Sequence, residues 1–512
     1  MVMLHGGVLL VRAAALGLVT VGIAATGAGL QSERVQDAAG VSAAQTPKGA
    51  TGEAARLYGL AGDNLLWTED REDELLRILA GAPRHGLDMS ARIAAVKAAQ
   101  AGPGDMRQRD LALSQAALAY ADALAHGVVD PARLHEIYTL PRNRVDLAAG
   151  LNAALSENRL AAWFESLAPA DPAYRAMAAA YAAERAAAAS GGAAKVPEGP
   201  SLRPKGRDGR VPVLSQSLVR AGELKAPVQG NVYGPELVAA VRRLQARSGL
   251  VADGVVGPAT LGVLNRGPAE RARALAVNME RLRWQERTAP ATRIVVNIPS
   301  ASMQYLRSGA VAWEGRVVVG SPDNQTPLLG QDFDRLVLNP PWNVPKSIAE
   351  AEILPKGRRY LVANDMTIKD GRVIQKAGPK SALGLVKFDM ENPYAIYLHD
   401  TPQKALFGAA NRHRSHGCVR VENAVAFARK LAEERGLAAE FDRKLQAGDT
   451  APLALGEAIP VRLIYLTVQA DPSGRLIYLP DVYGFDDKVA EALGLGAGAK
   501  LARVRAERLL GP

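Results

Sequence analysis

The only cysteine of the 512-residue chain, Cys418, lies in the segment HRSHGCVR with two of the seven histidines, His413 and His416. A third histidine, His399, stands nineteen residues before the cysteine at the end of the run AIYLH. A thiol reacts as its thiolate, and a histidine within hydrogen-bond reach can remove its proton or stabilise the ion pair. Histidines gathered around a lone cysteine therefore predict a nucleophilic Cys–His pair that performs acyl transfer.

His399 is better placed than His416 to act as the base for Cys418. The run YAIYLHD predicts a strand whose end delivers His399 from a neighbouring part of the fold. Residues two apart on an extended segment, such as His416 and Cys418, point the same way and lie about 7 Å apart. Gly417 lets the backbone expose the thiol and present N–H groups to an oxyanion.

Two other interpretations of the cluster stay open. In the first, Cys418 is a small buried hydrophobe and the histidines gather by chance. In the second, His399, His413, His416 and Cys418 bind zinc. These ligand types suit zinc, but H-x2-H-x-C is not a familiar zinc spacing and no cysteine pair anchors it. Our interpretation requires neither a metal nor a cofactor.

The composition is that of a basic globular protein, with 48% hydrophobic and 22% charged residues, a net charge of +10 and a pI near 9.6. A basic balance fits an anionic polymer or an anionic membrane surface. Nucleic acid is not an expected partner, because the sequence shows no nucleic-acid motif and no basic patch interleaved with aromatic residues. A single cysteine excludes an intrachain disulfide.

The beginning of the chain, residues 1–30, predicts export. The uncharged run 13–30 follows Arg12 and precedes polar residues, as in a secretory signal peptide. Its eighteen residues also approach the length of a membrane-spanning helix, so a retained anchor in the inner membrane is the alternative. Both alternatives place the rest of the chain outside the cytoplasm.

Hydrophobic periodicity divides the rest of the chain into three parts. Helical spacing of apolar residues dominates the first two, and short β-branched runs bounded by turn residues dominate the third. Segments rich in small, polar, Gly or Pro residues separate them. The predicted parts are a linker (31–52), an α-helical domain (53–189), a second linker (190–209), a three-helix domain (210–268), a β-rich domain (291–470) with a long insertion (346–388), and a strand-and-helix tail (471–512).

The three-helix domain resembles the peptidoglycan-binding domain of many cell-wall enzymes. The resemblance rests on the pattern DG..G..T...L, formed here by Asp253, Gly254, Gly257, Thr260 and Leu264. Leu244 stands where that family often has an aromatic residue. The alternative is a helical spacer that binds no ligand.

The segments IYLHD and SHGCVR are similar to the signature of the L,D-transpeptidase catalytic domain family, a histidine followed within twenty residues by S/T-H-G-C-x-R. NPPWNVPKSIAEAEILP (339–355) and DVYGFD (481–486) resemble the large multidomain Gram-negative branch of that family, and LLWTED and HGLD resemble the scaffold domain of that branch. The expected fold class is multidomain α+β, with a helical scaffold, a three-helix peptidoglycan-binding domain and a β-rich catalytic domain whose insertion caps the active site as a lid.

The resemblance implies a periplasmic peptidoglycan L,D-transpeptidase that carbapenems inhibit and that helps to build the cell wall. Cys418 would take the acyl group of a tetrapeptide stem as a thioester, and the diaminopimelate amine of a second stem would attack it to give a 3→3 cross-link. His399 would act as general acid and base. The partners would be these stem peptides within the anionic cell wall. The alternative is a non-catalytic peptidoglycan-binding scaffold with a degenerate cysteine site.

The resemblance also implies roles for residues around the pair. The backbone carbonyl of Asp400 would orient His399, and backbone N–H groups at Gly417 would form the oxyanion hole. Arg420 would bind a substrate carboxylate, with a structural salt bridge as the alternative. The further substrate-binding candidates are Ser415, His416, Tyr397 and Trp342, although structural packing is the competing explanation for the last three.

Overall fold

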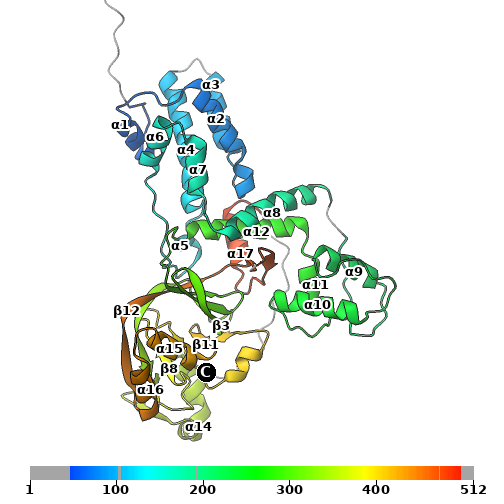
Figure 1. Ribbon diagram of the computed structural model, residues 1–512, viewed down its shortest axis with the longest axis vertical. Helices are drawn as coiled ribbons and strands as arrows, with labels where there is room; N and C mark the ends of the chain where they lie inside the picture. The colour runs from blue at the N-terminus through cyan, green and yellow to red at the C-terminus, as the bar shows by residue number, and fades with distance from the viewer. Residues whose placement is uncertain (1–45, 102–104, 192–193, 472, 497–512) are drawn as a thin grey trace, which may run out of the picture. The chain divides into compact units, whose positions relative to one another are not determined.

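The computed structural model describes residues 46–101, 105–191, 194–471 and 473–496. The predicted signal peptide or anchor, most of the first linker and the last residues of the predicted tail lie outside these ranges. Within the described ranges, no helix has both the length and the apolar character needed to cross a membrane. The predicted fold class is confirmed: two helical regions precede a region rich in β-strands (Figure 1).

The first helical region is built around one long helix, α4, which buries more than half of its residues. Its core is aliphatic and alanine-rich, and α2, α4 and α7 pack against one another within it. Several helices begin at side-chain caps, and Thr68 accepts a hydrogen bond from the Arg71 amide at the start of α2. The elements are α1 (Gly52–Leu60), α2 (Glu69–Ala80), the 3₁₀ helix η1 (Ala82–His85), α3 (Ser90–Ala101), α4 (Met106–His126), α5 (Pro131–Leu134), α6 (Leu147–Ser156) and α7 (Leu160–Leu167).

The second helical region comprises α9 (Val211–Arg220), α10 (Pro235–Arg247) and α11 (Pro258–Leu264) around its own apolar core. The residues of its sequence pattern meet at Gln245, a buried side chain on α10. Gln245 donates to Asp253 at 2.9 Å and Thr260 at 3.1 Å and accepts from the Gly254 amide at 2.8 Å. Gly254 has φ +76°, and a Cβ there would come within 2.8 Å of Val238. The pattern thus encodes a tight loop, and glycine is required at its centre.

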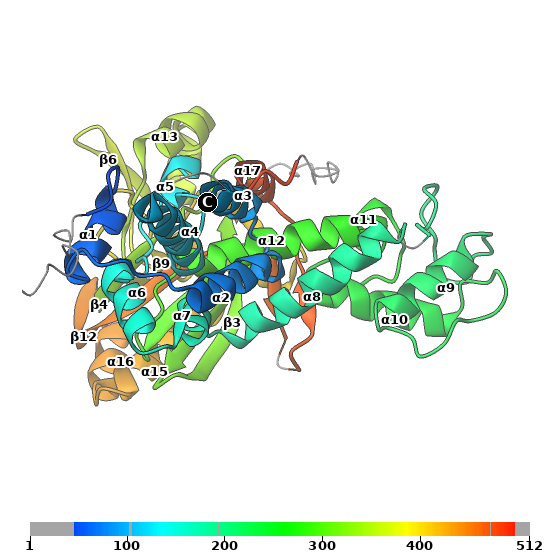
Figure 2. The same cartoon turned by 90° about the horizontal axis from the view of Figure 1, so that it is seen from above.

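Two helices from distant parts of the sequence, α8 (Pro172–Ala189) and α12 (Pro268–Trp284), pack side by side (Figure 2). The second half of α12 is buried throughout and contains the charged residues Glu280, Arg281 and Arg283. Glu280 accepts from the amides of Val128 and Val129 at 2.6 and 2.8 Å, so α12 holds the loop after α4. The strand-rich region begins a few residues after α12 ends.

The strands close into a barrel. The order is β10-β3-β11-β9-β8-β4-β12-β1-β2, and an additional pairing of β2 with β3 closes the circle, which leaves β10 as a branch on β3. The helix α15 (Ala424–Glu433) contributes Phe427 and Leu431 to the barrel core, and α16 (Ala438–Ala447) follows it. The strands are β1 (Arg293–Asn297), β2 (Ser302–Arg307), β3 (Ala310–Gly320), β4 (Gly330–Leu338), β8 (Val386–Phe388), β9 (Leu398–His399), β10 (His413–Ser415), β11 (Val419–Val421) and β12 (Ala451–Ile464).

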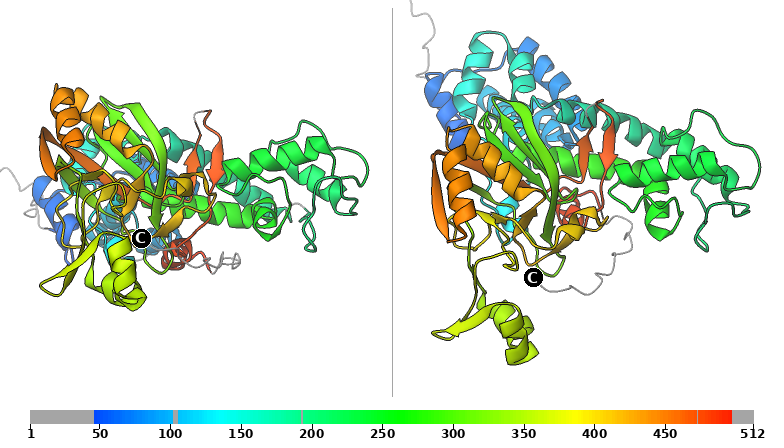
Figure 3. Two further views of the ribbon diagram at one scale, coloured as in Figure 1. Left: turned by 90° about the horizontal axis from the view of Figure 1, so that it is seen from below. Right: turned by 60° about the horizontal axis from the view of Figure 1, so that its bottom comes forward.

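The predicted lid insertion is an ordered lobe with its own apolar core, drawn in yellow-green in Figure 3. Within it, β6 and β7 form a hairpin that pairs with β5. Trp342 belongs to β5 and to the lobe's core. The elements are β5 (Trp342–Asn343), α13 (Lys346–Ile348), the π-helix η2 (Ala349–Ile353), η3 (Leu354–Lys356), α14 (Gly357–Ala363), β6 (Met366–Lys369) and β7 (Arg372–Gln375).

The remaining elements are a 3₁₀ helix, η4 (Lys404–Gly408), and the chain's last hairpin and helix, β13 (Val468–Ala470), β14 (Leu476–Tyr478) and α17 (Phe485–Ala492). Asn423 occupies the N-cap position of α15, as its sequence suggests, but it does so with φ 52° and without a side-chain cap. The start of α15 is therefore set by a left-handed residue and not by the usual side-chain hydrogen bond.

Candidate active site

The register of two parallel strands brings the predicted residues to one face of the barrel wall. In the pairing of β9 with β11, Leu398 lies opposite Val419 and His399 lies opposite Arg420. Leu398 and Val419 are fully buried in the barrel core. Because successive side chains of a strand point to opposite faces, His399 and Arg420 point away from that core. Cys418 and Tyr397, each two residues before one of these, share their side of the wall.

The turn before Cys418 is held by hydrogen bonds that fix the thiol. The Ser415 hydroxyl donates to the Cys418 carbonyl at 2.6 Å and accepts from the Gly417 amide at 3.2 Å. Gly417 has φ +114°, a conformation that disfavours any residue with a side chain. Ser415 is only 2% exposed. The hydroxyl is therefore engaged within the turn at rest, and its contact with substrate stays a prediction.

The same hydrogen bonds revise the oxyanion hypothesis. The Gly417 N–H already donates to Ser415, whereas the amide of Cys418 makes no hydrogen bond within the part of the chain that the structure describes. The backbone donor open to an incoming oxyanion is thus that of Cys418.

A second layer, which the residue pattern of the motif does not reveal, supports this turn. The Thr326 hydroxyl donates to the Gly417 carbonyl at 2.7 Å, and the Tyr483 hydroxyl donates to Gly320 at 2.7 Å and accepts from the Thr326 amide at 3.2 Å. Tyr483 belongs to the segment DVYGFD, whose resemblance to a family motif was the only sequence signal for it. Thr326 carried no such signal.

His399 is a buried, neutral imidazole. Burial lowers the pKa of His399 to about 3, and the neighbouring Arg420 cation adds to this effect. Nδ1 donates to the backbone carbonyl of Asp400. The Asp400 carboxylate in turn accepts from the Leu385 amide at 3.0 Å and pairs with Lys404. Nε2 makes no hydrogen bond among the described residues, so its lone pair is open to a proton donor.

Cys418 is a partly exposed, neutral thiol. Burial raises the pKa of Cys418, and the backbone at Tyr397, the cations Arg420 and Lys387 and the Tyr397 hydroxyl reduce this effect without cancelling it. The sulfur donates to the Ala395 carbonyl at 3.5 Å. The resting pair is therefore thiol and imidazole, and not thiolate and imidazolium.

Arg420 is a buried cation with no acid beside it. Its side chain is 4% exposed, Nη1 donates to Gln403 at 3.0 Å, and Nε has no partner. Burial lowers the pKa of Arg420 to about 10, and only the Cys418 thiol opposes the shift. None of the ion pairs among the described residues involves Arg420, so the structure gives no support to the salt-bridge alternative.

Lys387 is a residue of the site that sequence reasoning missed. It lies on β8 directly opposite His399, pairs with Asp389 at 2.6 Å and approaches the ring centroid of Tyr397 to 4.6 Å. Its place depends on the pairing of β8 with β9, which no local motif reveals. Lys387 and Arg420 make this face of the barrel positively charged.

Tyr397 and Trp342 connect the site to the lid lobe. Burial raises the pKa of Tyr397, and contact with the Cys418 thiol adds to the shift. Trp342 is 5% exposed, and its hydrogen bond with Tyr397 lowers the pKa of Tyr397 and so offsets part of that rise. Tyr397 packs against both the barrel core and the core of the lobe. Both predicted aromatic residues therefore lie at the border between the barrel and the lobe.

The two remaining histidines point in different directions. His416 Nε2 lies 2.6 Å from Glu352 Oε1, on the π-helix of the lobe. His413 Nε2 lies 2.9 Å from the Ile298 carbonyl, and burial lowers the pKa of His413 to about 4. Their nitrogens do not converge on Cys418, as a zinc site would require. No group of three or more His, Cys, Asp or Glu side chains suited to a metal occurs in the described ranges.

Comparison with known families identifies the barrel. The description "L,D-transpeptidase catalytic domain" (YkuD) matches residues 291–441, which include both Cys418 and His399. The chain carries an L,D-transpeptidase catalytic domain. The transpeptidase domain is preceded by matches to "Scaffold domain" at residues 52–180 and to "Putative peptidoglycan binding domain" at residues 207–264.

Individual proteins are also similar to parts of this chain. A curated Haemophilus influenzae protein named "Putative L,D-transpeptidase" is 36% identical over 242 residues, which are 42% of this chain and 48% of the relative. The match thus spans about half the length of that relative. A solved L,D-transpeptidase from Stackebrandtia nassauensis shares 12% identity with a TM-score of 0.22, covering 51% of this chain and 97% of that one. A solved L,D-transpeptidase from Xylanimonas cellulosilytica shares 16% identity with a TM-score of 0.18, covering 52% of this chain and 100% of that one. Structural likeness at this level carries no argument.

Proposed function

We propose that this protein is a peptidoglycan L,D-transpeptidase that forms 3→3 diaminopimelate cross-links through a thioester on Cys418. The observation that carries the proposal is the face shared by Cys418 and His399 on two neighbouring parallel strands, with His399 Nε2 open. The match of residues 291–441 to the transpeptidase family supports it. Because peptidoglycan lies outside the cytoplasm, the proposal places the protein in the periplasm, either exported by a cleaved signal peptide or held by a retained N-terminal membrane anchor.

The first half-reaction transfers the acyl group to the enzyme. His399 Nε2 takes the thiol proton as the Cys418 sulfur attacks the diaminopimelate carbonyl of the donor tetrapeptide. The Cys418 amide donates to the oxyanion that forms. The bond to the terminal D-alanine then breaks, and the imidazolium returns its proton to the leaving amine. The product is a thioester, which retains the free energy needed for transfer without ATP.

The second half-reaction releases the product. The side-chain amine of diaminopimelate on a second stem attacks the thioester, and His399 accepts the proton that this amine loses. The carbon–sulfur bond breaks, the Cys418 thiolate regains a proton from His399, and the new amide is the cross-link. Arg420 and Lys387 create a positive field on this face, which favours stems that carry carboxylates.

The resting protonation states give the substrate a role in starting the reaction. A neutral thiol beside a neutral imidazole is slow to attack, because little thiolate exists at neutral pH. A bound stem covers the site and excludes water, so the thiol, which donates to the Ala395 carbonyl at rest, turns to the open Nε2 of His399 and proton transfer is coupled to attack. The lid lobe, which contacts the site through Trp342 and Glu352, is the element we expect to cover the stem.

The experiment is covalent trapping with a carbapenem, read by intact mass. The wild-type protein is expected to gain one adduct, Cys418→Ala none, and His399→Asn an adduct formed 10²- to 10⁴-fold more slowly. His413→Gln is the matched control, since His413 lies on the same barrel but bonds to Ile298, and it should react like wild type.

Purified sacculi with diaminopimelate stems then test the product. Wild type should generate 3→3 cross-linked muropeptides, and Cys418→Ala should not. A wild-type protein that gains no adduct and forms no cross-link, yet sediments with sacculi, would replace this proposal with the non-catalytic peptidoglycan-binding scaffold.

A further inference from the structure

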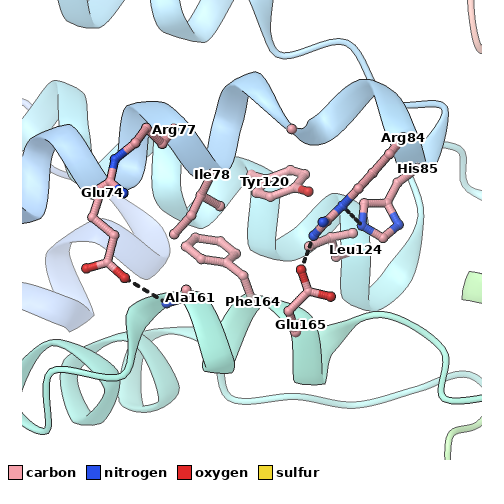
Figure 4. Close-up of a pocket in the computed structure, with 11 residues that line it drawn as sticks. Glu74, Arg77, Ile78, Arg84, His85, Tyr120, Leu124, Ala161, Phe164 and Glu165 are labelled. Carbon is pink, nitrogen blue, oxygen red and sulfur yellow. Dashed lines mark hydrogen bonds and ion pairs between the residues drawn. The ribbon is translucent and has the colours of Figure 1, made fainter. Parts of the chain in front are cut away.

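The first helical region contains a hollow between α2, η1, α4 and α7, and its charged side chains are already engaged within the chain (Figure 4). Arg84 pairs with Glu165. Glu74 accepts from a backbone amide of α7 at 3.2 Å, and Arg77 donates to a carbonyl of its own helix at 3.2 Å. These groups have partners in the fold, whereas the amide of Cys418 in the candidate active site has none among the described residues.

The amide of Cys418 belongs to the same peptide group as the carbonyl of Gly417. A peptide group is planar and almost always trans, so its N–H and its C=O point in opposite directions. The Gly417 carbonyl accepts from the Thr326 hydroxyl at 2.7 Å. Whatever fixes the direction of this carbonyl therefore also fixes the direction of the Cys418 N–H, the donor that is open to an oxyanion.

The three consecutive peptide groups around Gly417 and Cys418 are held by different side chains. Ser415 holds the outer two, because its hydroxyl accepts from the Gly417 amide at 3.2 Å and donates to the Cys418 carbonyl at 2.6 Å. The middle group, which contains the Cys418 N–H, has one hydrogen bond among the described residues, the one from Thr326. Within the described ranges, Thr326 is thus the hydrogen-bonding restraint on the group that carries the oxyanion donor.

Gly417 makes rotation of this middle peptide group easy. Its φ is +114°, in the region that favours glycine, and a residue without a Cβ meets few steric barriers as its ψ changes. Turned over, the group would present the Gly417 carbonyl oxygen where the Cys418 N–H now lies. An oxygen in that place would repel an oxyanion, whereas the N–H stabilises it. A restraint on this group is therefore a requirement of the chemistry.

The direction in which the Thr326 hydroxyl donates is set by its neighbours. Thr326 is fully buried, and its side-chain oxygen accepts from the Gly320 amide at 2.8 Å. An amide N–H can only donate, so the single hydroxyl proton of Thr326 is left for the Gly417 carbonyl. Tyr483 holds both neighbours in place, since its hydroxyl donates to the Gly320 carbonyl at 2.7 Å and accepts from the Thr326 amide at 3.2 Å.

We propose that Thr326 is a positioning residue for acyl transfer, which directs the Cys418 N–H at the oxyanion through the shared peptide group. The inference rests on the proposed function, in which that N–H stabilises the oxyanion formed on the diaminopimelate carbonyl. As negative charge develops, the N–H donates more strongly, and the hydrogen bond from Thr326 to the other end of the same peptide group strengthens with it. Tyr483 acts one step further back, by holding Thr326 in place.

The test compares two reactions of the same sulfur in the full-length protein. A carbapenem acylates Cys418 through a tetrahedral oxyanion. Iodoacetamide alkylates it by displacement: the sulfur–carbon bond forms as the carbon–iodine bond breaks, iodide leaves, and no oxyanion arises. Cys418 is the only cysteine, so one added mass per molecule reports this site in both reactions. Intact mass followed over time gives the two rate constants.

Thr326→Val removes the hydroxyl and keeps the shape of the side chain. It should slow acylation about 10²-fold, the usual effect of losing one oxyanion donor, and should leave the rate constant of alkylation unchanged. Thr326→Ser keeps the hydroxyl and should restore acylation to nearly the wild-type rate. Rescue by serine shows that acylation depends on the hydroxyl and not on the bulk of the side chain.

Tyr483→Phe tests the same restraint from its other side. It leaves the Thr326 hydroxyl in place but frees the backbone that carries it, so acylation should slow about tenfold while alkylation stays unchanged. Tyr305→Phe is the matched control, because the ring of Tyr305 lies in the same barrel core and its hydroxyl contacts Glu434 at 2.7 Å. This control should be acylated like wild type. Tyr483→Phe decides the question if Thr326→Val does not fold.

Acylation of Thr326→Val at the wild-type rate would overturn the proposal. So would a loss of acylation that alkylation matches, because Thr326 would then support the turn as a whole and not the oxyanion donor. A serine variant as slow as the valine variant would also count against the hydroxyl. A wild-type protein that iodoacetamide modifies and a carbapenem does not would instead contradict the proposed function itself.

Discussion

Two buried arginines of this protein, Arg283 on α12 and Arg420 on β11, differ in what surrounds their charge. Arg283 donates to Glu280 at 2.8 Å, to the Tyr174 hydroxyl at 3.0 Å and to the His85 carbonyl. Burial opposes its charge, but Tyr174 and Glu280 outweigh burial, and the pKa of Arg283 lies above its ordinary value. Among the residues that the structure describes, Arg420 has one amide partner and no ion pair with an acid, and burial lowers the pKa of Arg420 to about 10.

The difference indicates what each region does. A charge taken out of water is tolerated when its partner is built into the fold, and the contacts of Arg283 tie α12 to the first helical region in this way. Arg420 is buried without that compensation, beside a thiol on a positively charged face. We infer that its missing anion arrives with the substrate, as the carboxylate of a stem peptide. Structural charges are satisfied at rest, and functional charges are satisfied when the ligand binds.

The largest expected effect comes from removing the acid next to Arg283. Glu280→Gln places an amide donor against the guanidinium and leaves a buried charge unpaired, which should destabilise the region by about 3 to 5 kcal/mol. Hydrogen exchange of the α12 amides measures this locally, which suits a chain of several domains. Glu433→Gln, which removes an exposed pair with Arg429, should change stability by at most about 0.5 kcal/mol. Equal effects of the two substitutions would contradict the comparison.

Arg420→Met should have the opposite pattern of effects, with little change in stability and a large loss of activity. It removes an uncompensated buried charge, so stability should stay the same or rise. The rate constant for transfer from a tetrapeptide donor should fall about 10²-fold, because a charged hydrogen bond to the substrate is lost. Kinetics and thermal unfolding of the same preparation measure the two effects. A loss of stability without a loss of rate would make Arg420 a structural residue like Arg283.

The sequence predicted the parts of this site that are local and missed those that depend on strand pairing. Cys418 and His399 were found because thiol and imidazole chemistry is rare in this chain, and the fold class was found from hydrophobic periodicity. Lys387 and Thr326 were missed, since each reaches the site through a partner distant in sequence. The contact of the Ser415 hydroxyl with the Cys418 carbonyl was not foreseen, because a motif shows which residues occur together, but not which hydroxyl points into a turn.

His135 and His399 extend the comparison to histidines. Burial lowers the pKa of both to about 3. Neither ring nitrogen of His135 has a hydrogen-bond partner among the described residues, and the ring centroids of His135 and Phe485 lie 4.5 Å apart. An unfolded histidine has a pKa near 6.5, so the folded state binds fewer protons below that pH. Each such histidine therefore adds stability above about pH 6.5 that is lost as pH falls toward 3, about 2 kcal/mol by pH 5.

His135→Leu should remove that sensitivity at its own position. Denaturant unfolding at both pH values measures the free energy of unfolding of the variant minus that of wild type. This difference should be about 2 kcal/mol larger at pH 5 than at pH 7.5. The pH 7.5 measurement is the internal control, because little protonation occurs there in either state. A variant whose pH dependence equals that of wild type would show that His135 is protonated in the folded protein.

The smallest expected effect concerns the ion pair between the lid lobe and the site. Glu352 and His416 are partly exposed, with 28% and 16% of their side chains accessible, so their contact should contribute at most about 1 kcal/mol. Glu352→Gln should therefore raise the rate of limited proteolysis within residues 346–388 less than fivefold, and should raise KM more than it lowers kcat. A carbapenem bound at Cys418 should protect the same segment.

Glu350→Gln provides the matched control for that pair. Glu350 lies two residues earlier, is 61% exposed and contacts Lys346 within the lobe, so its loss should leave both cleavage and kinetics unchanged. If the two variants behave alike, or if the carbapenem leaves cleavage unaltered, the lobe is an ordinary surface excursion. If only Glu352→Gln changes KM, the carboxylate of Glu352 takes part in substrate binding. It would reach the site from the lobe and move away when the lobe opens. Arg420 would still lack an acid of the protein, and its anion would still have to come from the substrate.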